Sequence, residues 1–253
     1  MKRFWPGPLT LVLPKAPRVP EIVTAGLPTV AVRMPDHPMA LALIREAGCP
    51  IAAPSANRFG RPSPTHHDHV LDCLAGRIEA VLACGPTPVG IESTVVSLVE
   101  TPPRVLRPGG TPLEALREVV GELRVDPSKP SQGAVSAPGT LPRHYVPQTP
   151  LFLLELGPPK GRESLPRRRC GILAYRGEWH DFAHVEVLSQ SGDLREAAAR
   201  FFAALHELDR AGLLAIVAEP VPEEGLGVAI MDRLRRAASG RARLDDEFVW
   251  ITR

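Results

Sequence analysis

Short apolar runs alternate along the first half of the chain with stretches in which apolar residues recur at helical spacing. Runs rich in β-branched residues predict strands, whereas apolar residues repeating every three to four positions between capping residues predict helices. The predicted strands lie at 9–14, 29–35, 50–54, 79–84, 93–99 and 104–107. The predicted helices lie at 37–48, 65–76 and 111–121, with Thr65 and Thr111 as N-caps of the last two. This order predicts a mixed α/β domain.

A second alternating pattern follows residue 150. Its predicted strands lie at 151–156, 170–175, 184–189 and 213–219, and its predicted helices at 192–212 and 225–240. Strand and helix alternation at these lengths predicts a small parallel sheet with crossover helices. The proline-rich stretch between the two patterns has no usable period and predicts an ordered linker. We therefore expect an α/β domain at 1–125, a linker at 126–150 and a second α/β domain at 151–253.

Composition narrows the class of protein. The 253 residues are 44% hydrophobic and carry a formal net charge of +2. A net charge this close to zero gives no strong overall attraction to nucleic acids or to anionic membranes. No run of about 18 apolar residues predicts a membrane span. Four scattered cysteines without a CxxC spacing indicate reduced thiols, which predicts a cytoplasmic protein. The 29 prolines are spread along the chain, which favours many rigid turns over a disordered tail.

The loop "APSANRFGRPSPT" (53–65) carries Ser55, Asn57 and Ser63 just after an apolar run. Their short hydroxyl and amide groups suit phosphate or ribose oxygens, and Gly60 permits close approach of the backbone. The alternative is a turn in which these side chains satisfy their own backbone, and the pattern by itself favours that alternative.

Two arginines end predicted strands. Arg33 closes the run "TVAVR" and can bind a carboxylate bidentately, and Arg107 in "RVLRPGG" can meet a phosphate. The alternative for Arg33 is a solvated charge at a sheet edge. Ser93 precedes Thr94 at the start of an apolar strand, where a simple polar end residue is the alternative interpretation.

Other polar clusters carry weaker signals. His66, His67 and His69 lack the i, i+4 spacing that places two metal ligands on one helix face, so we expect no metal ligand there. The arginines at 167–169 and those at 233, 235 and 236 are predicted to be solvated rather than bound to RNA. The chain contains no G-x-S-x-G around its candidate serines, no Walker A motif and no G-x-G-x-x-G motif.

Taken in order, eight segments resemble one family. They are "FWPGPLTLVL", "PTVAVRMPDHP", "PIAAPSANRFGRPSPT", "GIESTVVSLV", "VLRPGG", "SAPGTLPRHYVP", "AARFFAALHELDRAG" and "EEGLGVAIMDRLRRAA". Together they resemble the Sua5-type threonylcarbamoyl-AMP synthases, and the resemblance covers essentially the whole chain. It implies a YrdC-like twisted mixed sheet with helices, followed by a small Rossmann-like α/β Sua5 domain.

The resemblance also implies a reaction. Such enzymes make threonylcarbamoyl-AMP and pyrophosphate from L-threonine, bicarbonate or CO2, and ATP with Mg2+. The product is the donor for the N6-threonylcarbamoyl modification of adenosine 37 in tRNA, so tRNA and the transfer machinery are expected partners. A threonine carbamate attacks the α-phosphate, so catalysis is mainly positioning and charge stabilisation, and no nucleophilic side chain is implied.

Residue by residue, the resemblance implies two sets of contacts. The ATP contacts are Thr29, Ser55, Asn57, Ser63, Arg107 and Tyr145. The threonine contacts are Arg33, Ala53 and Ser93, with Arg33 as the partner of the carboxylate. Tyr145, beside His144, resembles the aromatic residue with which the linker folds back over the nucleotide. The linker is therefore expected to act as a lid.

The chain departs from the family at its start. Family members carry a further strand and a K-x-R motif, whose cations face the ATP phosphates, ahead of the segment resembling "FWPGPLTLVL". Lys2 and Arg3 are adjacent and do not match that motif. We therefore expect an N-terminally incomplete first domain, and weak or absent synthase activity of this chain by itself. A non-catalytic RNA-binding module and an inactive remnant are the alternatives, although neither explains why the site-like residues are all present in order.

Overall fold

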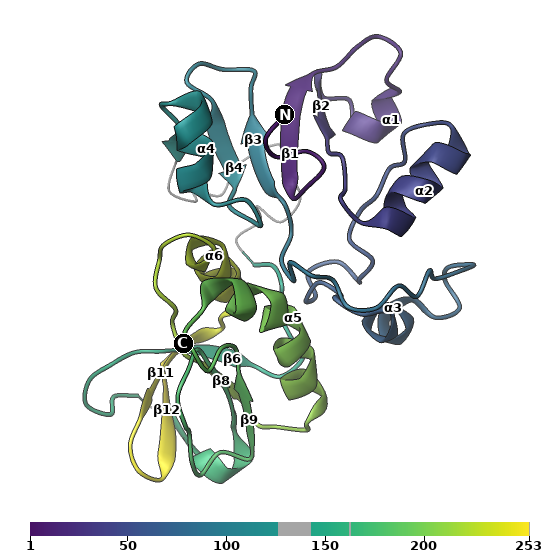
Figure 1. The fold of residues 1–253 in the computed structure, drawn as a ribbon. Coiled ribbons are helices and arrows are strands. Elements are labelled where there is room, and N and C mark those ends of the chain that lie inside the picture. Colours follow the sequence, from purple (N-terminus) through teal and green to yellow (C-terminus); the bar gives the residue numbers. More distant parts are fainter. Residues whose placement is uncertain (126–142, 162, 253) are drawn as a thin grey trace. The chain divides into compact units, whose positions relative to one another are not determined.

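The computed structural model describes residues 1–125, 143–161 and 163–252, and it divides into two compact units (Figure 1). Unit 1 contains Met1–Pro54 and residues 92–125, and unit 2 contains Ser55–Ile91 and the described residues from 143 onward. Part of the expected linker, 126–142, lies outside the described residues. The boundaries at 125 and 150 therefore remain a prediction. No helix of the described segments is long and apolar enough to cross a membrane.

Unit 1 is built on a five-stranded mixed sheet in the order β2-β1-β3-β4-β5. Strand β1 pairs antiparallel with β2 and parallel with β3, β3 pairs antiparallel with β4, and β4 pairs parallel with β5. This arrangement confirms the predicted twisted mixed sheet with helices. The strands are β1 Leu9–Pro14, β2 Thr29–Val32, β3 Thr94–Ser97, β4 Arg104–Arg107 and β5 Arg124–Val125; the helices are α1 Glu21–Thr24, α2 Pro38–Ala47 and α4 Leu113–Val120.

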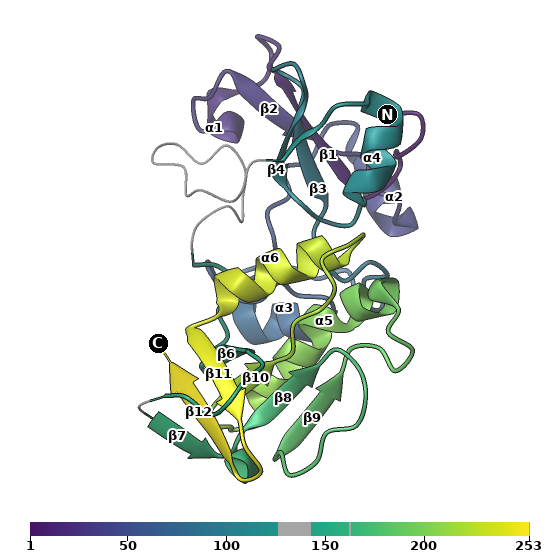
Figure 2. The same ribbon diagram turned by 90° about the vertical axis from the view of Figure 1, so that its left-hand side faces the viewer.

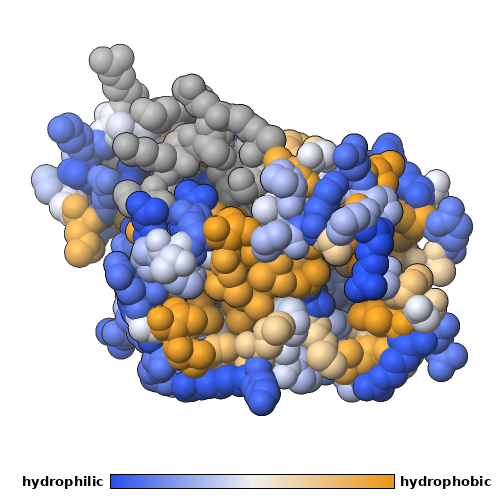
Figure 3. Space-filling view, turned by 90° about the horizontal axis from the view of Figure 1, so that it is seen from above, coloured by the Kyte–Doolittle hydropathy of each residue, from blue (hydrophilic) through white to orange (hydrophobic). Residues whose placement is uncertain are grey.

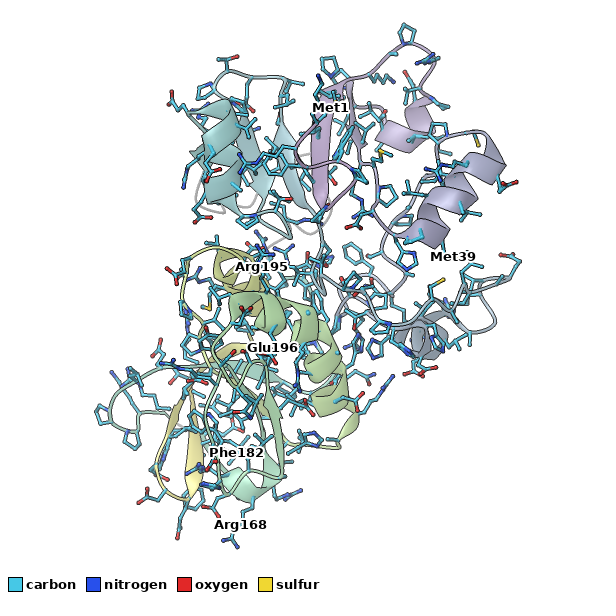
Figure 4. All side chains as sticks on the ribbon, viewed as in Figure 1. Met1, Met39, Arg168, Phe182, Arg195 and Glu196 are labelled. Carbon is cyan, nitrogen blue, oxygen red and sulfur yellow. The ribbon has the colours of Figure 1, made fainter. Side chains whose placement is uncertain are left out.

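The two helices of unit 1 that the sequence predicted differ in burial. Helix α4 buries Leu113 and Leu116, whereas α2, which ends at a left-handed Gly48 as predicted, has no buried residue. Met39 on α2 is 47% exposed (Figure 4), and Ile22 of α1 is 91% exposed. Figure 3, a view of the molecule from above, shows hydrophobic residues grouped near the middle of this surface. The core of unit 1 is therefore concentrated around β1, β3 and β4.

Two predicted strands and two predicted caps are wrong. Residues 50–54 and 79–84 form no strand and do not pair with either sheet. Ile51 and Leu82 of these segments are 42% and 58% exposed. An apolar run becomes a strand only where an adjacent backbone supplies hydrogen bonds, which the pattern does not reveal. His66 rather than Thr65 caps α3 (His67–Leu74), and Pro112 rather than Thr111 precedes α4. The hydroxyl of Thr111 instead donates to the carbonyl of Pro8, 3.1 Å away.

Unit 2 contains a seven-stranded sheet in the order β7-β12-β11-β6-β10-β8-β9. The five strands from β11 to β9 are parallel, and β12 and β7 add an antiparallel edge. The prediction captured β6, β8, β9 and β10 but missed the other three strands. The strands are β6 Leu151–Leu154, β7 Glu163–Pro166, β8 Gly171–Ala174, β9 His184–Val187, β10 Ile216–Ala218, β11 Gly240–Leu244 and β12 Phe248–Thr252; the remaining elements are α3, η1 Arg167–Arg169, α5 Leu194–Arg210 and α6 Gly227–Ala237.

The sheet of unit 2 has an apolar layer on each face. Leu173 of β8 packs with α5 and α6, while its neighbours Ile172 and Ala174 belong to the core on the opposite face. This alternation follows from the period of two along a strand. Figure 2 shows α5 and α6 lying along the sheet. Asp193 caps α5 by accepting hydrogen bonds from the backbone amides of Arg195 and Glu196, two residues of the first turn that Figure 4 labels.

Residues 55–91 belong to unit 2 although they precede unit 1's β3 in the sequence. Val89 and Ile91 pack against the α5–α6 core. A Cβ atom on Gly90 would lie 2.2 Å from the carbonyl oxygen of Ala198, so only glycine permits this approach to α5. The loop 53–65 therefore runs from unit 1 into unit 2 at residues 54 and 55.

Candidate functional site

The side chains of Thr10, Ser93 and Arg107 form a buried polar cluster in unit 1, here called the Arg107 cluster. The Arg107 guanidinium donates to the carbonyl oxygen of Ser93 at 2.9 Å and to its hydroxyl at 3.4 Å. The Ser93 hydroxyl also lies 2.7 Å from that of Thr10 on β1. Arg107 is 8% exposed and Ser93 is 4% exposed. One predicted ATP contact and one predicted threonine contact therefore touch each other.

Backbone contacts fix the shape of this cluster. The amide of Gly110 donates to the carbonyl of Glu92 at 2.9 Å. A Cβ atom on Gly109 would lie 2.3 Å from the same oxygen, so the turn after β4 requires glycine there. The Thr94 hydroxyl donates to the carbonyl of Thr111 at 2.7 Å and accepts from its amide at 3.0 Å. The strand starts and the turn thus hold Arg107 in one position.

Thr10, Thr94 and Thr111 help to build this cluster, a role that the sequence pattern did not predict. A usable signal existed, because Thr10 and Thr94 interrupt otherwise apolar strand runs. A hydroxyl at a buried strand position needs a hydrogen-bond partner, which indicates a buried polar contact.

Thr29 and Arg33 lie at the two ends of the edge strand β2. Thr29 is half-buried and pairs in register with Pro14 of β1. Arg33 follows the last residue of β2 and is exposed, and within the described residues its guanidinium makes no ion pair or hydrogen bond. Its position fits either a solvated charge or a partner for a ligand carboxylate. Ala53 and Ser55 are also exposed, on either side of the passage from unit 1 to unit 2.

Residues 55–65, here called the Asn57 loop, are shaped by their own side chains. The Asn57 amide nitrogen donates to the carbonyl of Arg58 at 2.9 Å and to that of Arg61 at 3.1 Å. Its amide oxygen is buried and has no partner within the described residues. Asn57 therefore satisfies the backbone, as the turn interpretation expected, and retains an acceptor that suits a hydroxyl or amine donor rather than a phosphate.

A pair of histidines attaches the end of the Asn57 loop to α5. His206 Nε2 lies 3.1 Å from the carbonyl oxygen of Ser63, and the amide of Thr65 donates to His69 Nδ1 at 3.2 Å. The two imidazole rings stack with centroids 4.0 Å apart. Burial, followed by the nearby His206, lowers the pKa of His69 to about 4, and burial also lowers the pKa of His206. Both rings are therefore neutral at neutral pH.

Residues 144–146 pack on the same loop. The amide of Val146 donates to the carbonyl of Gly60 at 2.8 Å, and the His144 ring meets Phe59 edge-on at 5.9 Å. Tyr145 is 1% exposed, has a left-handed φ of 63°, and packs its ring on Phe202 of α5. The aromatic pair thus makes contacts within unit 2, as its presence in the sequence indicated.

Charged residues of α6 support this packing. Arg236 donates to Asp232 Oδ1 at 3.0 Å, and Arg233 donates to Asp232 Oδ2 at 3.3 Å. The Arg233 guanidinium also lies 5.6 Å from the Tyr145 ring centroid. The predicted solvation of Arg233 and Arg236 is therefore wrong, since they are 0% and 9% exposed. Burial is tolerated because a carboxylate lies between the two cations.

The other predicted solvated arginines largely remain so. Arg235 is exposed and forms an ion pair with Glu223. Arg168, which is labelled in Figure 4, is exposed. Arg167 is half-buried, because its guanidinium stacks 4.7 Å from the Phe182 ring centroid.

The structure thus brings the predicted residues together in two groups. Within unit 1, Ser93 and Arg107 are in direct contact, and Thr29 and Arg33 bracket β2. Within unit 2, the loop that carries Asn57 and Ser63 packs against the segment of Tyr145.

The chain is similar to known proteins over nearly its whole length. Residues 1–109 match the family described as telomere recombination (Sua5, YciO and YrdC). Residues 111–239 match the family described as threonylcarbamoyl-AMP synthase, C-terminal domain. The threonylcarbamoyl-AMP synthase of Pyrococcus abyssi is 44% identical over 251 residues, which are 95% of this chain and 73% of that protein. The enzyme of the same name from Bacillus subtilis is 44% identical over 250 residues, 95% of this chain and 72% of that protein.

A solved structure agrees with these sequence similarities. The crystal structure of P. abyssi Sua5 complexed with L-threonine matches with a TM-score of 0.84 and 43% identity, covering 94% of this chain and 72% of that one. Agreement in both halves confirms the resemblance drawn from the motifs and the predicted fold class. This chain therefore belongs to the threonylcarbamoyl-AMP synthase family, whose members are nucleotidyltransferase-type enzymes.

Proposed function

We propose that this chain is an L-threonylcarbamoyladenylate synthase, which makes threonylcarbamoyl-AMP and pyrophosphate from L-threonine, bicarbonate or CO2, and ATP. The observation that carries the proposal is the direct contact between Ser93 and Arg107 in a buried cluster. The first is a candidate contact of threonine and the second of ATP. A reaction that joins threonine to the α-phosphate needs these two ligands side by side.

The chemistry requires positioning more than a reactive side chain. The threonine amine takes up CO2 as a carbamate, a carbamate oxygen forms a bond to the α-phosphorus, and the bond to pyrophosphate breaks. An anion attacks a polyanion, so a cation at the phosphate lowers the barrier. Arg107 can supply that charge, and its hydrogen bonds to Ser93 hold the guanidinium in place.

For threonine we propose Arg33, Ala53 and Ser93. Arg33 is exposed at the end of β2, where its planar guanidinium can take a carboxylate through two parallel hydrogen bonds. The Ser93 hydroxyl, which contacts Thr10, can donate to or accept from a polar group of the ligand. The small side chain of Ala53 leaves the backbone of this residue accessible to the ligand.

For ATP we propose Thr29, Ser55, Asn57, Ser63, Arg107 and Tyr145. The buried amide oxygen of Asn57 suits a ribose hydroxyl or the adenine amine. Mg2+ arrives with the nucleotide, as part of the substrate. We propose that the linker, residues 126–150, acts as a lid over the nucleotide, and the packing of residues 144–146 on the Asn57 loop supports this.

The proposed biological role follows from the product. Threonylcarbamoyl-AMP is an activated acyl donor, and we propose that it serves the N6-threonylcarbamoylation of adenosine 37 in tRNA, with tRNA and the transfer machinery as partners. The four free cysteines are compatible with the cytoplasmic location that we propose.

The test measures ligand binding before turnover, because binding reports on the two proposed ligand sites separately. Calorimetric titration of the full chain with L-threonine, and separately with MgATP, should show one site for each. D-Threonine serves as the matched control, and we expect it to bind more weakly. Turnover is then measured as pyrophosphate release that requires threonine, bicarbonate and MgATP together. Absence of both L-threonine and MgATP binding would refute the proposal.

A further inference from the structure

Three polar side chains converge at the start of α3. The donor atoms of His66, His67 and Asp68 all lie within 4.8 Å of one another, and they are the only such group of three among the residues that the structure describes. His66 Nδ1 lies 3.1 Å from Asp68 Oδ2, and His67 Nε2 lies 3.4 Å from Asp68 Oδ1. The two imidazoles therefore approach one carboxylate, each at a different oxygen.

These separations match a tetrahedral metal site. With metal–ligand bonds of about 2.0–2.1 Å, adjacent donor atoms lie about 3.3–3.4 Å apart. Both measured distances are close to this value, although they end on different oxygens of Asp68, and every pair of donor atoms lies within 4.8 Å, so side-chain rotation can bring all three groups to one ion. We propose that His66, His67 and Asp68 bind a divalent transition-metal ion, with Zn2+ as the best match.

The hydrogen bonds of His66 support a cation at this place. Its Nδ1 accepts a long hydrogen bond of 3.5 Å from the amide of Asp68, as the cap of α3, so this nitrogen bears its single lone pair. A bound ion would take that lone pair in place of the cap hydrogen bond. A carboxylate oxygen 3.1 Å away also bears lone pairs. Two acceptors at this distance repel each other unless a proton or a metal ion lies between them.

The i, i+4 spacing of metal ligands is required only of residues that lie inside a helix. His66 has φ −140° and ψ 155°, so it is extended and lies outside α3. Its side chain is therefore not directed by the helical period, and it can face the residues that follow it. We predicted no metal ligand from the sequence because residues 66–69 were all taken to be helical.

The ligand set selects the kind of ion. Two imidazoles and one carboxylate suit Zn2+, Co2+ and Ni2+, whereas Mg2+ prefers oxygen ligands. The side chains of His66, His67 and Asp68 are 33%, 31% and 61% exposed, so an ion can enter from solvent and keep a water molecule as its fourth ligand. This site is independent of the Mg2+ that accompanies ATP and of the proposed synthase activity.

The experiment uses the full chain, stripped of metal with a chelator, in a buffer that does not bind metal. Titration with Co2+ is followed by visible absorption, and titration with Zn2+ by calorimetry. We expect one equivalent of each ion to bind and the Co2+ spectrum to be that of a tetrahedral site. A large excess of Mg2+ should not displace it.

Variants identify the ligands. His67→Gln and Asp68→Asn should each weaken Zn2+ binding by more than about tenfold, because the loss of a residue that only supports a metal ligand already lowers metal affinity by about that factor. Both keep the imidazole of His66, which caps α3. The matched control is His180→Gln, because His180 is exposed and lies 3.9 Å from Glu178. We expect it to bind Zn2+ as the unchanged chain does.

Several outcomes would overturn the proposal. They are the absence of one-equivalent binding, equal affinity in the His67→Gln and Asp68→Asn variants and the unchanged chain, or equal weakening by His180→Gln. A near-ultraviolet charge-transfer band from thiolate to Co2+ would also overturn it, because exposed Cys49 or Cys84 would then be the ligand.

Discussion

The Arg107 cluster of unit 1 and the Asn57 loop of unit 2 carry residues proposed for the same reaction, yet different forces hold them. Strand starts and a glycine turn fix the Arg107 cluster through backbone contacts within one sheet. The Asn57 loop has no strand of its own and is held by the side chain of His206 of α5 and by the backbone of Val146, in the segment of Tyr145. One region is thus positioned by its own fold and the other by a later part of the chain.

The largest expected effect concerns the buried charges that support the Asn57 loop. Asp232→Asn removes the carboxylate that lies between Arg233 and Arg236, and we expect a loss of about 3 kcal/mol in the free energy of unfolding. Denaturant unfolding of the full chain measures it. The control on the same helix is Glu223→Gln, which breaks an exposed ion pair with Arg235 and should cost less than about 1 kcal/mol. Equal losses in the two variants would contradict the role given to burial.

The next prediction separates the two proposed ligands. Arg107→Ala should weaken MgATP binding more than threonine binding, and Arg33→Ala should do the reverse, each by about 2 kcal/mol or ~30-fold for its own ligand. Calorimetric titration measures both constants. Arg45→Ala, an exposed arginine of α2, is the control and should change neither. If both variants weakened both ligands alike, the assignment of separate ligands would fail.

A smaller effect is expected from pH. Burial lowers the pKa of His206, so below about pH 6.5 the unfolded chain binds a proton that the folded chain resists. This contribution to stability is therefore present at neutral pH and is lost as the pH falls. His206→Phe keeps an aromatic ring beside His69 but cannot titrate, so its melting temperature should fall less between pH 7 and pH 5. Exposed His180→Phe should leave the wild-type dependence unchanged, and an identical dependence in all three proteins would contradict the prediction.

The smallest effect concerns thiol reactivity, which reports on packing in unit 2. Cys170 is 0% exposed, and burial raises the pKa of its thiol to about 11, so at pH 8 it stays protonated. We expect a thiol reagent to label exposed Cys49 and Cys84 quickly and Cys170 only after unfolding. Mass spectrometry of labelled peptides checks the order. Rapid labelling of Cys170 in the native chain would show that this core opens readily.

The sequence predicted those elements whose stability comes from their own apolar pattern. Helix α5 is an example, since its apolar stripe is buried. Strands β7 and β11 were missed because their side chains are mostly polar and their position is set by the backbone of their neighbours. Strand β12 did carry a signal, because residues 248–251 are a continuous run of aromatic and β-branched residues, which favours a strand.

The candidate site divides in the same way. Motifs identified Ser93 and Arg107, but their mutual contact depends on strands that are distant in sequence, so spacing could not predict it. Arg233 was predicted to be solvated because its charge usually belongs at a surface; its burial depends on Asp232 and on the ring of Tyr145. The role of the Asn57 amide as a backbone partner was the alternative that the residue types favoured.

The packing of Gly90 on α5 bears on how the protein folds during synthesis. Residues 89–91 leave the ribosome well before Ala198, whose backbone they contact. Unit 2 therefore cannot close its core until α5 has emerged, whereas all the strands of unit 1 have been made by residue 125. During translation, the apolar side chains of Val89 and Ile91 therefore stay without their α5 partners until α5 has been made, and exposed apolar surface of this kind favours aggregation.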